Sequence, residues 1–142
     1  MRDPRTVFAE IGEAAFYQLT TAFYEGVATD PILRPMYPDD NLEPARLRLT
    51  LFLIQFFGGP TTYSDERGHP RLRMRHLPFA IDRAARDIWV SHMSAALEGL
   101  ALAPDVREVM SRYFEDAATF LINRFDTPPT AIIARLEEIP RG

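Results

Sequence analysis

Apolar residues recur at intervals of three and four along most of the 142-residue chain, and no segment alternates convincingly at every second position. This period places apolar side chains on one face of a helix, so it predicts an all-α fold. Gly12 is expected to break the first periodic run into a short and a long helix. A chain of this length builds a single core, so we expect one domain. The periodic runs span residues 8–27, 45–56, 85–100 and 109–121.

Turn-forming residues mark the expected helix boundaries. Asp30-Pro31 predicts a capped corner that ends at Met36-Tyr37, and Gly58-Gly59-Pro60 predicts the end of the next helix. Residues 58–70, GGPTTYSDERGHP, have neither periodicity and contain three Gly and two Pro. They predict a long ordered loop or a helix that is mostly lost.

Composition excludes several function classes. The chain has no Cys, which removes disulfides, thiolate catalysis, Cys-ligated zinc and iron–sulfur clusters. Its three His, His69, His76 and His92, are not spaced for a shared zinc site. The net charge of −4 argues against nucleic-acid binding. No apolar run is long enough to span a membrane and no signal peptide is visible, so we expect a cytoplasmic protein.

His76 has the most informative setting of the three. It follows the Arg-rich stretch RLRMR and precedes Leu77-Pro78-Phe79, so its ring is expected to point inward. One interpretation is a buried His that bonds to backbone; the other is a metal ligand that faces an apolar cavity, as haem iron requires. Tyr24, Tyr37 and Trp89 each combine an apolar body with a donor at the tip, although each alone is more typical of a core.

Three stretches together resemble the truncated haemoglobins, specifically group II, the O-type. They are FYEGVATDPILRPMYPDDNL, LFLIQFFGGPTTYSDERGHPRLRMRHLPFAI and DIWVSHM, and the likeness covers about residues 7–125. The resemblance implies a globin-like two-over-two helical sandwich with an ordered loop before the proximal histidine. We therefore expect a truncated globin domain over 1–126 and a C-terminal extension over 127–142, partly disordered or a short helix.

The resemblance also implies a haem b cofactor and assigns residues to it. The proximal ligand of the iron falls on His76, and the distal donors fall on Tyr24, Tyr37 and Trp89, of which we expect Trp89 to be the principal one. Ala45 stands where other globins carry a distal His. Haem propionates call for guanidinium and hydroxyl groups, and the candidates are Arg48, Tyr63, Arg73 and Arg75. Leu49, Phe52 and Met36 are the expected apolar contacts of the haem.

Three functions follow as hypotheses. The first is a haem globin with high oxygen affinity, used in oxygen capture or in redox chemistry of O₂, NO or peroxide. The second is a peroxidase-like haem enzyme, and the third is a cofactor-free all-α interaction module. The expected partners are a diatomic gas (O₂, CO or NO) and an electron donor of unknown identity, with the chain a monomer or a homodimer.

Overall fold

The computed structural model describes residues 2–76 and 79–124, except for the side chain of Arg73. Every regular element in this part of the chain is helical, which confirms the all-α prediction. The extension expected at 127–142 lies outside the described residues. The elements are η1 (Pro4–Thr6), α1 (Val7–Ala28), η2 (Arg34–Met36), α2 (Glu43–Phe56), α3 (Thr62–Arg67), α4 (Leu72–His76), α5 (Arg83–Glu98) and α6 (Pro104–Phe120).

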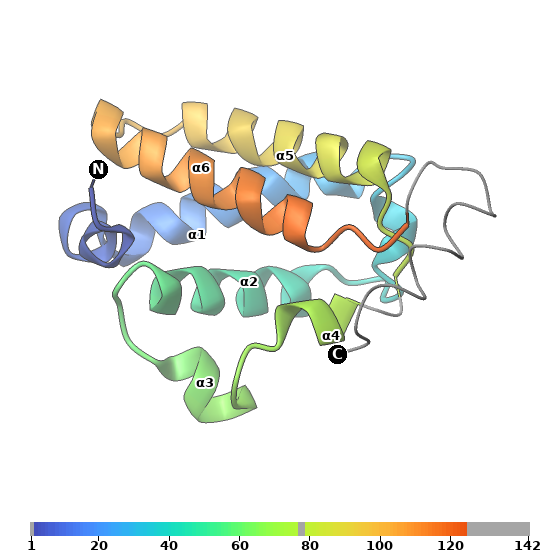
Figure 1. Cartoon of the computed structure of the whole chain (residues 1–142), viewed down its shortest axis with the longest axis horizontal. Coiled ribbons are helices and arrows are strands. Elements are labelled where there is room, and N and C mark those ends of the chain that lie inside the picture. Colours follow the sequence, from blue (N-terminus) through green and yellow to red (C-terminus); the bar gives the residue numbers. More distant parts are fainter. Residues whose placement is uncertain (1, 77–78, 125–142) are drawn as a thin grey trace, which may run out of the picture.

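Two pairs of long helices form the expected two-over-two sandwich. Helix α1 packs against both α2 and α5, and α5 packs against α6 (Figure 1). The short helices α3 and α4 lie on the other side of α2 (Figure 1). None of the helices in the described ranges is long and apolar enough to cross a membrane.

The apolar faces read from the sequence form the core. The largest fully buried side chains come from α1, the end of α2, α5 and α6, and include Phe16, Phe23, Phe57, Met93 and Met110. Burial of each such side chain contributes roughly 1.5–3 kcal/mol to folding. The long helices are therefore held by packing rather than by their own propensity.

A hydroxyl pair joins α1 to α2 inside this core. Thr20 and Thr50 are both fully buried, and their Oγ1 atoms lie 2.7 Å apart. The Thr50 hydroxyl donates to the carbonyl oxygen of Arg46 at 2.7 Å, so the Thr20 hydroxyl is the one that donates within the pair. Both buried hydroxyl groups between the two helices are therefore hydrogen-bonded.

Most predicted boundaries are confirmed. Gly12 has φ +81° and interrupts α1, as expected from its lack of a side chain. Gly58 has φ +100°, a backbone conformation that residues with a side chain rarely adopt. A Cβ there would also collide with the carbonyl oxygen of Arg5. The Asp82 carboxylate accepts from the Ala85 backbone at 2.8 Å and caps α5.

The segment 58–70 is only partly a loop. It contains the six-residue helix α3, which ends at Gly68 with φ +77°. The cause is a contact from another helix: the Gln55 side chain on α2 accepts from the Ser64 backbone at 2.9 Å and donates to the Ser64 hydroxyl at 2.7 Å. Local periodicity carries no sign of such a contact.

Candidate functional site

His76 ends the short helix α4 with its ring held in one orientation. Its Nδ1 lies 2.6 Å from the carbonyl oxygen of Leu72, one turn earlier. A carbonyl oxygen can only accept, so Nδ1 carries the proton and Nε2 keeps its lone pair. The Phe79 ring stands edge-on at 6.2 Å between centroids. This arrangement leaves one nitrogen of a neutral imidazole available to a metal ion.

Asn123, beyond the end of α6, holds the chain that follows His76. Its side-chain nitrogen donates to the carbonyl oxygens of Phe79 at 2.8 Å and of His76 at 3.3 Å, and its side-chain oxygen accepts from the Ile81 backbone at 2.8 Å. Five helical residues do not form a stable helix alone, so these contacts position α4 from outside. Sequence reasoning missed Asn123, because nothing local to it signals a contact with the segment around His76.

Tyr24, Tyr37 and Trp89 come together from three separate elements. Tyr24 lies on α1, Tyr37 directly follows η2, and Trp89 lies on α5. Ring centroids are 5.6 Å apart for Tyr24 and Tyr37, and 5.0 and 5.1 Å apart for Phe23 with Tyr24 and with Trp89. All these pairs meet edge to face, the arrangement that aromatic quadrupoles favour.

The polar tips of these three side chains form a network. Burial raises the pKa of Tyr24 well above its usual value, and hydrogen bonding to Tyr37 adds to the shift. Burial also raises the pKa of Tyr37, while hydrogen bonds from Tyr24 and Trp89 oppose that shift. Both phenols therefore stay protonated at neutral pH, and each keeps a hydroxyl hydrogen that it can donate.

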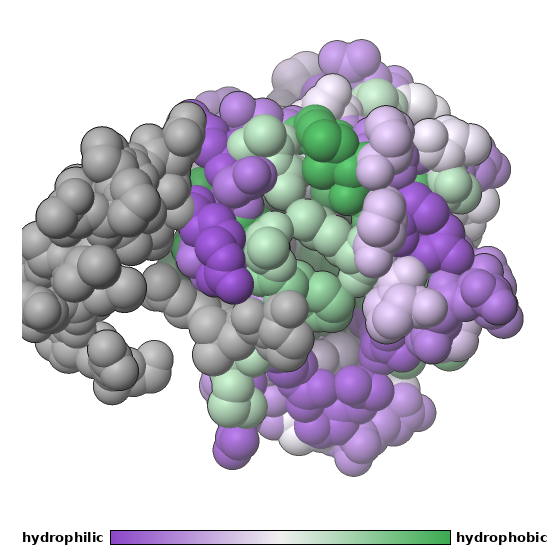
Figure 2. All heavy atoms as spheres, turned by 90° about the vertical axis from the view of Figure 1, so that its right-hand side faces the viewer, coloured by the Kyte–Doolittle hydropathy of each residue, from purple (hydrophilic) through white to green (hydrophobic). Residues whose placement is uncertain are grey.

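Helix α2 supplies an apolar face beside this network. Ala45, Leu49 and Phe52 follow the i, i+4, i+7 spacing of one helix face; the first two are half-buried and Phe52 is buried. Tyr63 of α3 is also buried and meets Phe52 edge-on at 5.5 Å. Met36, next to Tyr37, packs half-buried against the core. The end of the molecule at the right of Figure 1 is hollowed near its centre and lined by hydrophobic side chains (Figure 2).

The arginines predicted as propionate partners differ in their hydrogen bonds and in their exposure. Arg75 donates through Nη2 to the Arg67 carbonyl oxygen at 3.0 Å, but its buried Nε has no hydrogen-bond partner within the described ranges. Arg48 is exposed, although its charge reaches the Tyr24 phenol and opposes the rise in that pKa. His69 accepts from the Arg71 backbone at 3.2 Å and so orders the loop before α4. The predicted role of Arg73 falls on a side chain outside the description.

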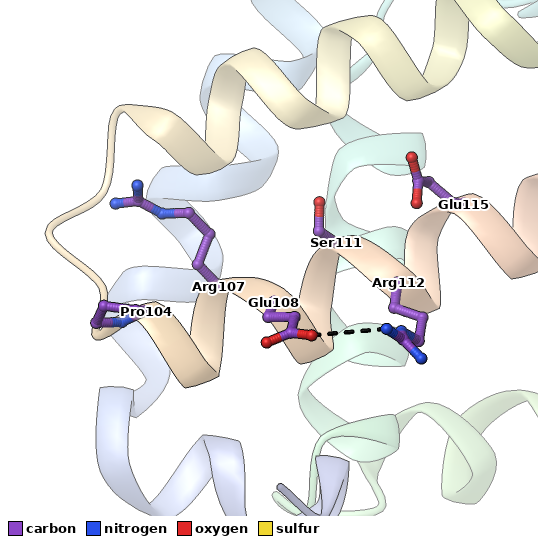
Figure 3. Close-up of a pocket in the computed structure, with 6 residues that line it drawn as sticks. All are labelled: Pro104, Arg107, Glu108, Ser111, Arg112 and Glu115. Atoms are coloured by element: carbon purple, nitrogen blue, oxygen red, sulfur yellow. Dashed lines mark ion pairs between the residues drawn. The ribbon is translucent and has the colours of Figure 1, made fainter. Parts of the chain in front are cut away.

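A second surface depression, on α6, offers no comparable chemistry. The residues that line it all come from this one helix, and Glu108 and Arg112 pair with each other at 3.6 Å (Figure 3). Such an exposed pair contributes little energy. The lining residues are Pro104, Arg107, Glu108, Ser111, Arg112 and Glu115.

Comparison with known proteins agrees with the arrangement of helices. The model of the family described as bacterial-like globin matches residues 6–129. The chain is 41% identical to the group 2 truncated hemoglobin YjbI of Bacillus subtilis over 117 residues, 82% of this chain and 88% of that protein. The chain belongs to the group II truncated haemoglobins.

Two solved haemoglobin structures bear out the fold. The thermostable hemoglobin of Thermobifida fusca superposes with a TM-score of 0.78 at 52% identity, covering 80% of this chain and 92% of that one. The truncated oxygen-avid haemoglobin of Bacillus subtilis superposes with the same TM-score of 0.78 at 38% identity, covering 82% of this chain and 98% of that one.

Membership of the truncated haemoglobins implies that this chain binds haem and, on it, a diatomic gas. The residues fit such a group chemically. His76 offers a free Nε2 for iron, and the buried, unpartnered Nε of half-buried Arg75 suits a carboxylate such as a haem propionate. A neutral hydroxyl donor at Tyr37 suits a small polar ligand.

Proposed function

We propose that this truncated haemoglobin binds oxygen tightly on haem b, with His76 as the protein ligand of the iron. The observation that carries the proposal is the convergence of Tyr24, Tyr37 and Trp89 on one network in which Tyr37 keeps a hydrogen to donate. Ferrous haem supplies an open coordination position for a diatomic gas and shifts electron density onto oxygen held there. Donors aimed at that charge slow the release of oxygen.

Each donor has a definite part. The indole N–H of Trp89 can only donate, so it is committed either to the bound gas or to the Tyr37 oxygen. The two phenols interact with each other, and each of them strengthens the other as a donor. A hydrogen bond to a charged acceptor contributes about 1.5–3 kcal/mol, which is enough to dominate an oxygen off-rate.

The rest of the pocket would hold the cofactor. Ala45, Leu49, Phe52 and Met36 supply an apolar wall against the porphyrin, and the small side chain of Ala45 leaves the space where other globins place a His. Arg75 is the best supported propionate partner because its buried Nε awaits an acceptor. Further candidates for contact with the propionates are Arg48, Tyr63 and Arg73.

Tight binding favours oxygen capture, or redox chemistry of O₂, NO or peroxide with an external electron donor, over oxygen delivery, which needs release. The peroxidase-like alternative is weaker. Nδ1 of His76 bonds to a backbone carbonyl rather than to a carboxylate, so the ring gains little of the anionic character that assists O–O cleavage. In support of tight binding, one structural relative at 38% identity is described as oxygen-avid.

A titration with haem tests the proposal directly. We expect a one-to-one complex with a Soret band, a ferrous form that binds CO and O₂, and slow oxygen dissociation in stopped flow. A protein that takes up no haem is a cofactor-free module, whereas rapid oxygen release would contradict the role of the donor network. Rapid turnover of peroxide with a reducing substrate would favour the enzyme alternative.

A further inference from the structure

We propose that His92 and Asp30 form a clasp that sets the distance between Trp89 and Tyr37, and that both are positioning residues for the distal network. The proposal rests on the distal role proposed above for Trp89 and Tyr37. It concerns two residues that the haem pocket itself does not use. The clasp joins the two elements that carry those donors, α5 and the corner after α1.

On the α5 side, the clasp lies one turn from the indole. His92 follows Trp89 by three residues, so the two side chains share a face of α5. The Nε2 of His92 lies 2.8 Å from Oδ2 of Asp30, across 62 positions of sequence. Their side chains are 28% and 13% exposed, so the pair is partly shielded from water. A shift of His92 therefore moves the base of Trp89 with it.

On the other side, Asp30 organises the corner that presents Tyr37. Its Oδ1 accepts from the Ile32 and Leu33 backbones at 2.8 and 2.9 Å, which fixes the first turn of the corner. Its carbonyl oxygen accepts from the Arg34 backbone at 3.0 Å. Asp30 thus uses one carboxylate oxygen for the corner and the other for α5.

Arg34 connects Asp30 to the backbone of Tyr37. Its Nη1 donates to the Tyr37 carbonyl oxygen at 2.8 Å, and its Nη2 donates to the carbonyl oxygens of Asp39 and Asp40 at 2.8 and 3.2 Å. An unbroken series of hydrogen bonds therefore runs from His92 through Asp30 and Arg34 to the backbone of Tyr37. Its two end links, His92 to Asp30 and Arg34 to Tyr37, are charge-assisted and belong to the stronger class of hydrogen bonds.

The ring of His92 is also fixed laterally, because it lies directly against α1. A Cβ at Gly26 would collide with Nδ1 of His92, so Gly26 is what allows the imidazole to reach Asp30. Close contact between a ring and a helix backbone leaves the ring little freedom to swing. Three residues therefore act together in the clasp: Gly26 on α1, Asp30 in the corner after α1, and His92 on α5.

The carboxylate of Asp30 is stabilised in its charged form. Hydrogen bonds from His92 and from the Leu33 and Ile32 backbones hold the pKa of Asp30 below its usual value. Asp30 therefore carries its charge at neutral pH and accepts from Nε2 of His92, which suits a fixed positioning contact.

The test compares three variants of the full chain. His92→Leu removes the donor, whereas His92→Gln keeps an N–H near the position of Nε2. Arg86→Met is the matched control: Arg86 also lies on α5, but it donates to Thr119 at 3.0 Å and to the Glu115 carbonyl at 3.2 Å, on α6. Circular dichroism establishes that each variant is folded.

Two measurements report on the donors rather than on stability. The C–O stretching band of the ferrous CO complex reports polar donors beside the ligand, and oxygen dissociation reports their strength. We expect His92→Leu to shift or split the C–O band towards that of Trp89→Phe and to speed oxygen release about three- to tenfold, equivalent to about 0.7–1.4 kcal/mol. His92→Gln and Arg86→Met should retain the band and the rate of the unaltered protein.

A third measurement needs no haem. Trp89 is the single tryptophan, so the emission of the apoprotein reports its surroundings directly. His92→Leu should shift this emission, and Arg86→Met should not. The clasp is overturned if His92→Leu matches Arg86→Met in band and emission, or if His92→Gln is as disturbed as His92→Leu. If Trp89→Phe itself leaves the C–O band unchanged, the proposed distal role fails, and the emission still decides on the clasp.

Discussion

Nδ1 of His76 donates to the carbonyl oxygen of Leu72 across 2.6 Å, within a single turn of α4. The bond settles two properties of the ring together: its tautomer, and the direction in which the free Nε2 lies. A His that bonds to backbone and a His that binds iron are opposite interpretations of the sequence alone. One ring can serve both, because Nδ1 bonds to the backbone and Nε2 stays available to a metal ion.

Replacement of His76 tests the proximal assignment. We expect His76→Gly to lose stable haem binding because the substitution removes the imidazole with the free Nε2, and added imidazole should restore a Soret band by filling the vacated space. His69→Ala is the control, since His69 accepts only from the Arg71 backbone in the preceding loop. Haem loss in His69→Ala together with haem retention in His76→Gly would reverse the assignment.

Replacement of Trp89 tests the donor network. Trp89→Phe keeps most of the ring but removes the N–H, and the loss of a bond worth about 1.5–3 kcal/mol should speed oxygen dissociation roughly ten- to a hundredfold. Carbon monoxide is less polarised when bound and should be affected less. Flash photolysis and stopped flow measure both rates. Equal acceleration for the two gases would make Trp89 a steric barrier instead of a donor.

Because Trp89, Tyr24 and Tyr37 interact as one group, their effects should not add. We expect Tyr37→Phe to release oxygen at least as fast as Trp89→Phe, and the double variant to be little faster than Tyr37→Phe alone, since groups in one network couple. Oxygen off-rates of the three variants and of the unaltered protein complete the double-mutant cycle. Strictly additive effects would show that Trp89 reaches the ligand independently of Tyr37.

Arg75 should matter to the holoprotein more than to the apoprotein. Its buried Nε has no partner among the described atoms, so Arg75→Met removes an unsatisfied group together with one bond to the Arg67 carbonyl. We expect the free energy of apoprotein unfolding to change by less than about 1 kcal/mol. Haem transfer to an acceptor globin should become roughly tenfold faster, at about 1.4 kcal/mol for a lost charged contact. Arg112→Met, on the far surface of α6, is the control and should leave haem transfer unchanged.

The Asp30 carboxylate should give stability a defined pH dependence. Its pKa is lowered in the folded chain, chiefly by the bond from His92, so its contribution is present above the unfolded-state value and is lost as pH falls through the folded value. Asp30→Asn should therefore be less stable than the unaltered protein at neutral pH, and the difference should shrink in acid. Urea midpoints measured from pH 7 down to pH 3 check this. A difference that stays constant over that range would show that the carboxylate charge has no part in it.

Local signals in the sequence predicted local structure well. Gly12 and Gly58 act through their own positive φ, and the structure bears out both predicted boundaries. The helix periods likewise identified the long helices and their buried faces. These features depend on steric and capping rules that operate over one helical turn.

Contacts between distant segments could not be read in the same way. Helix α3 exists because Gln55 reaches Ser64, and the segment after His76 is held by Asn123 from 44 and 47 positions away. Asp30 was predicted as a cap, and it is one, but its second oxygen binds a histidine on another helix. A polar residue that serves a remote partner looks the same in sequence as one that faces water.

The anchoring of α4 by Asn123 has a consequence for the order of events during synthesis. A chain grows from its N-terminus, so His76 emerges from the ribosome well before the residue that holds the backbone beside it. Until Asn123 has been added and α6 has packed, five helical residues have nothing to fix them, and the imidazole has no settled direction. On the proposed assignment of His76 to the iron, haem would enter the pocket only after nearly the whole globin domain has been made.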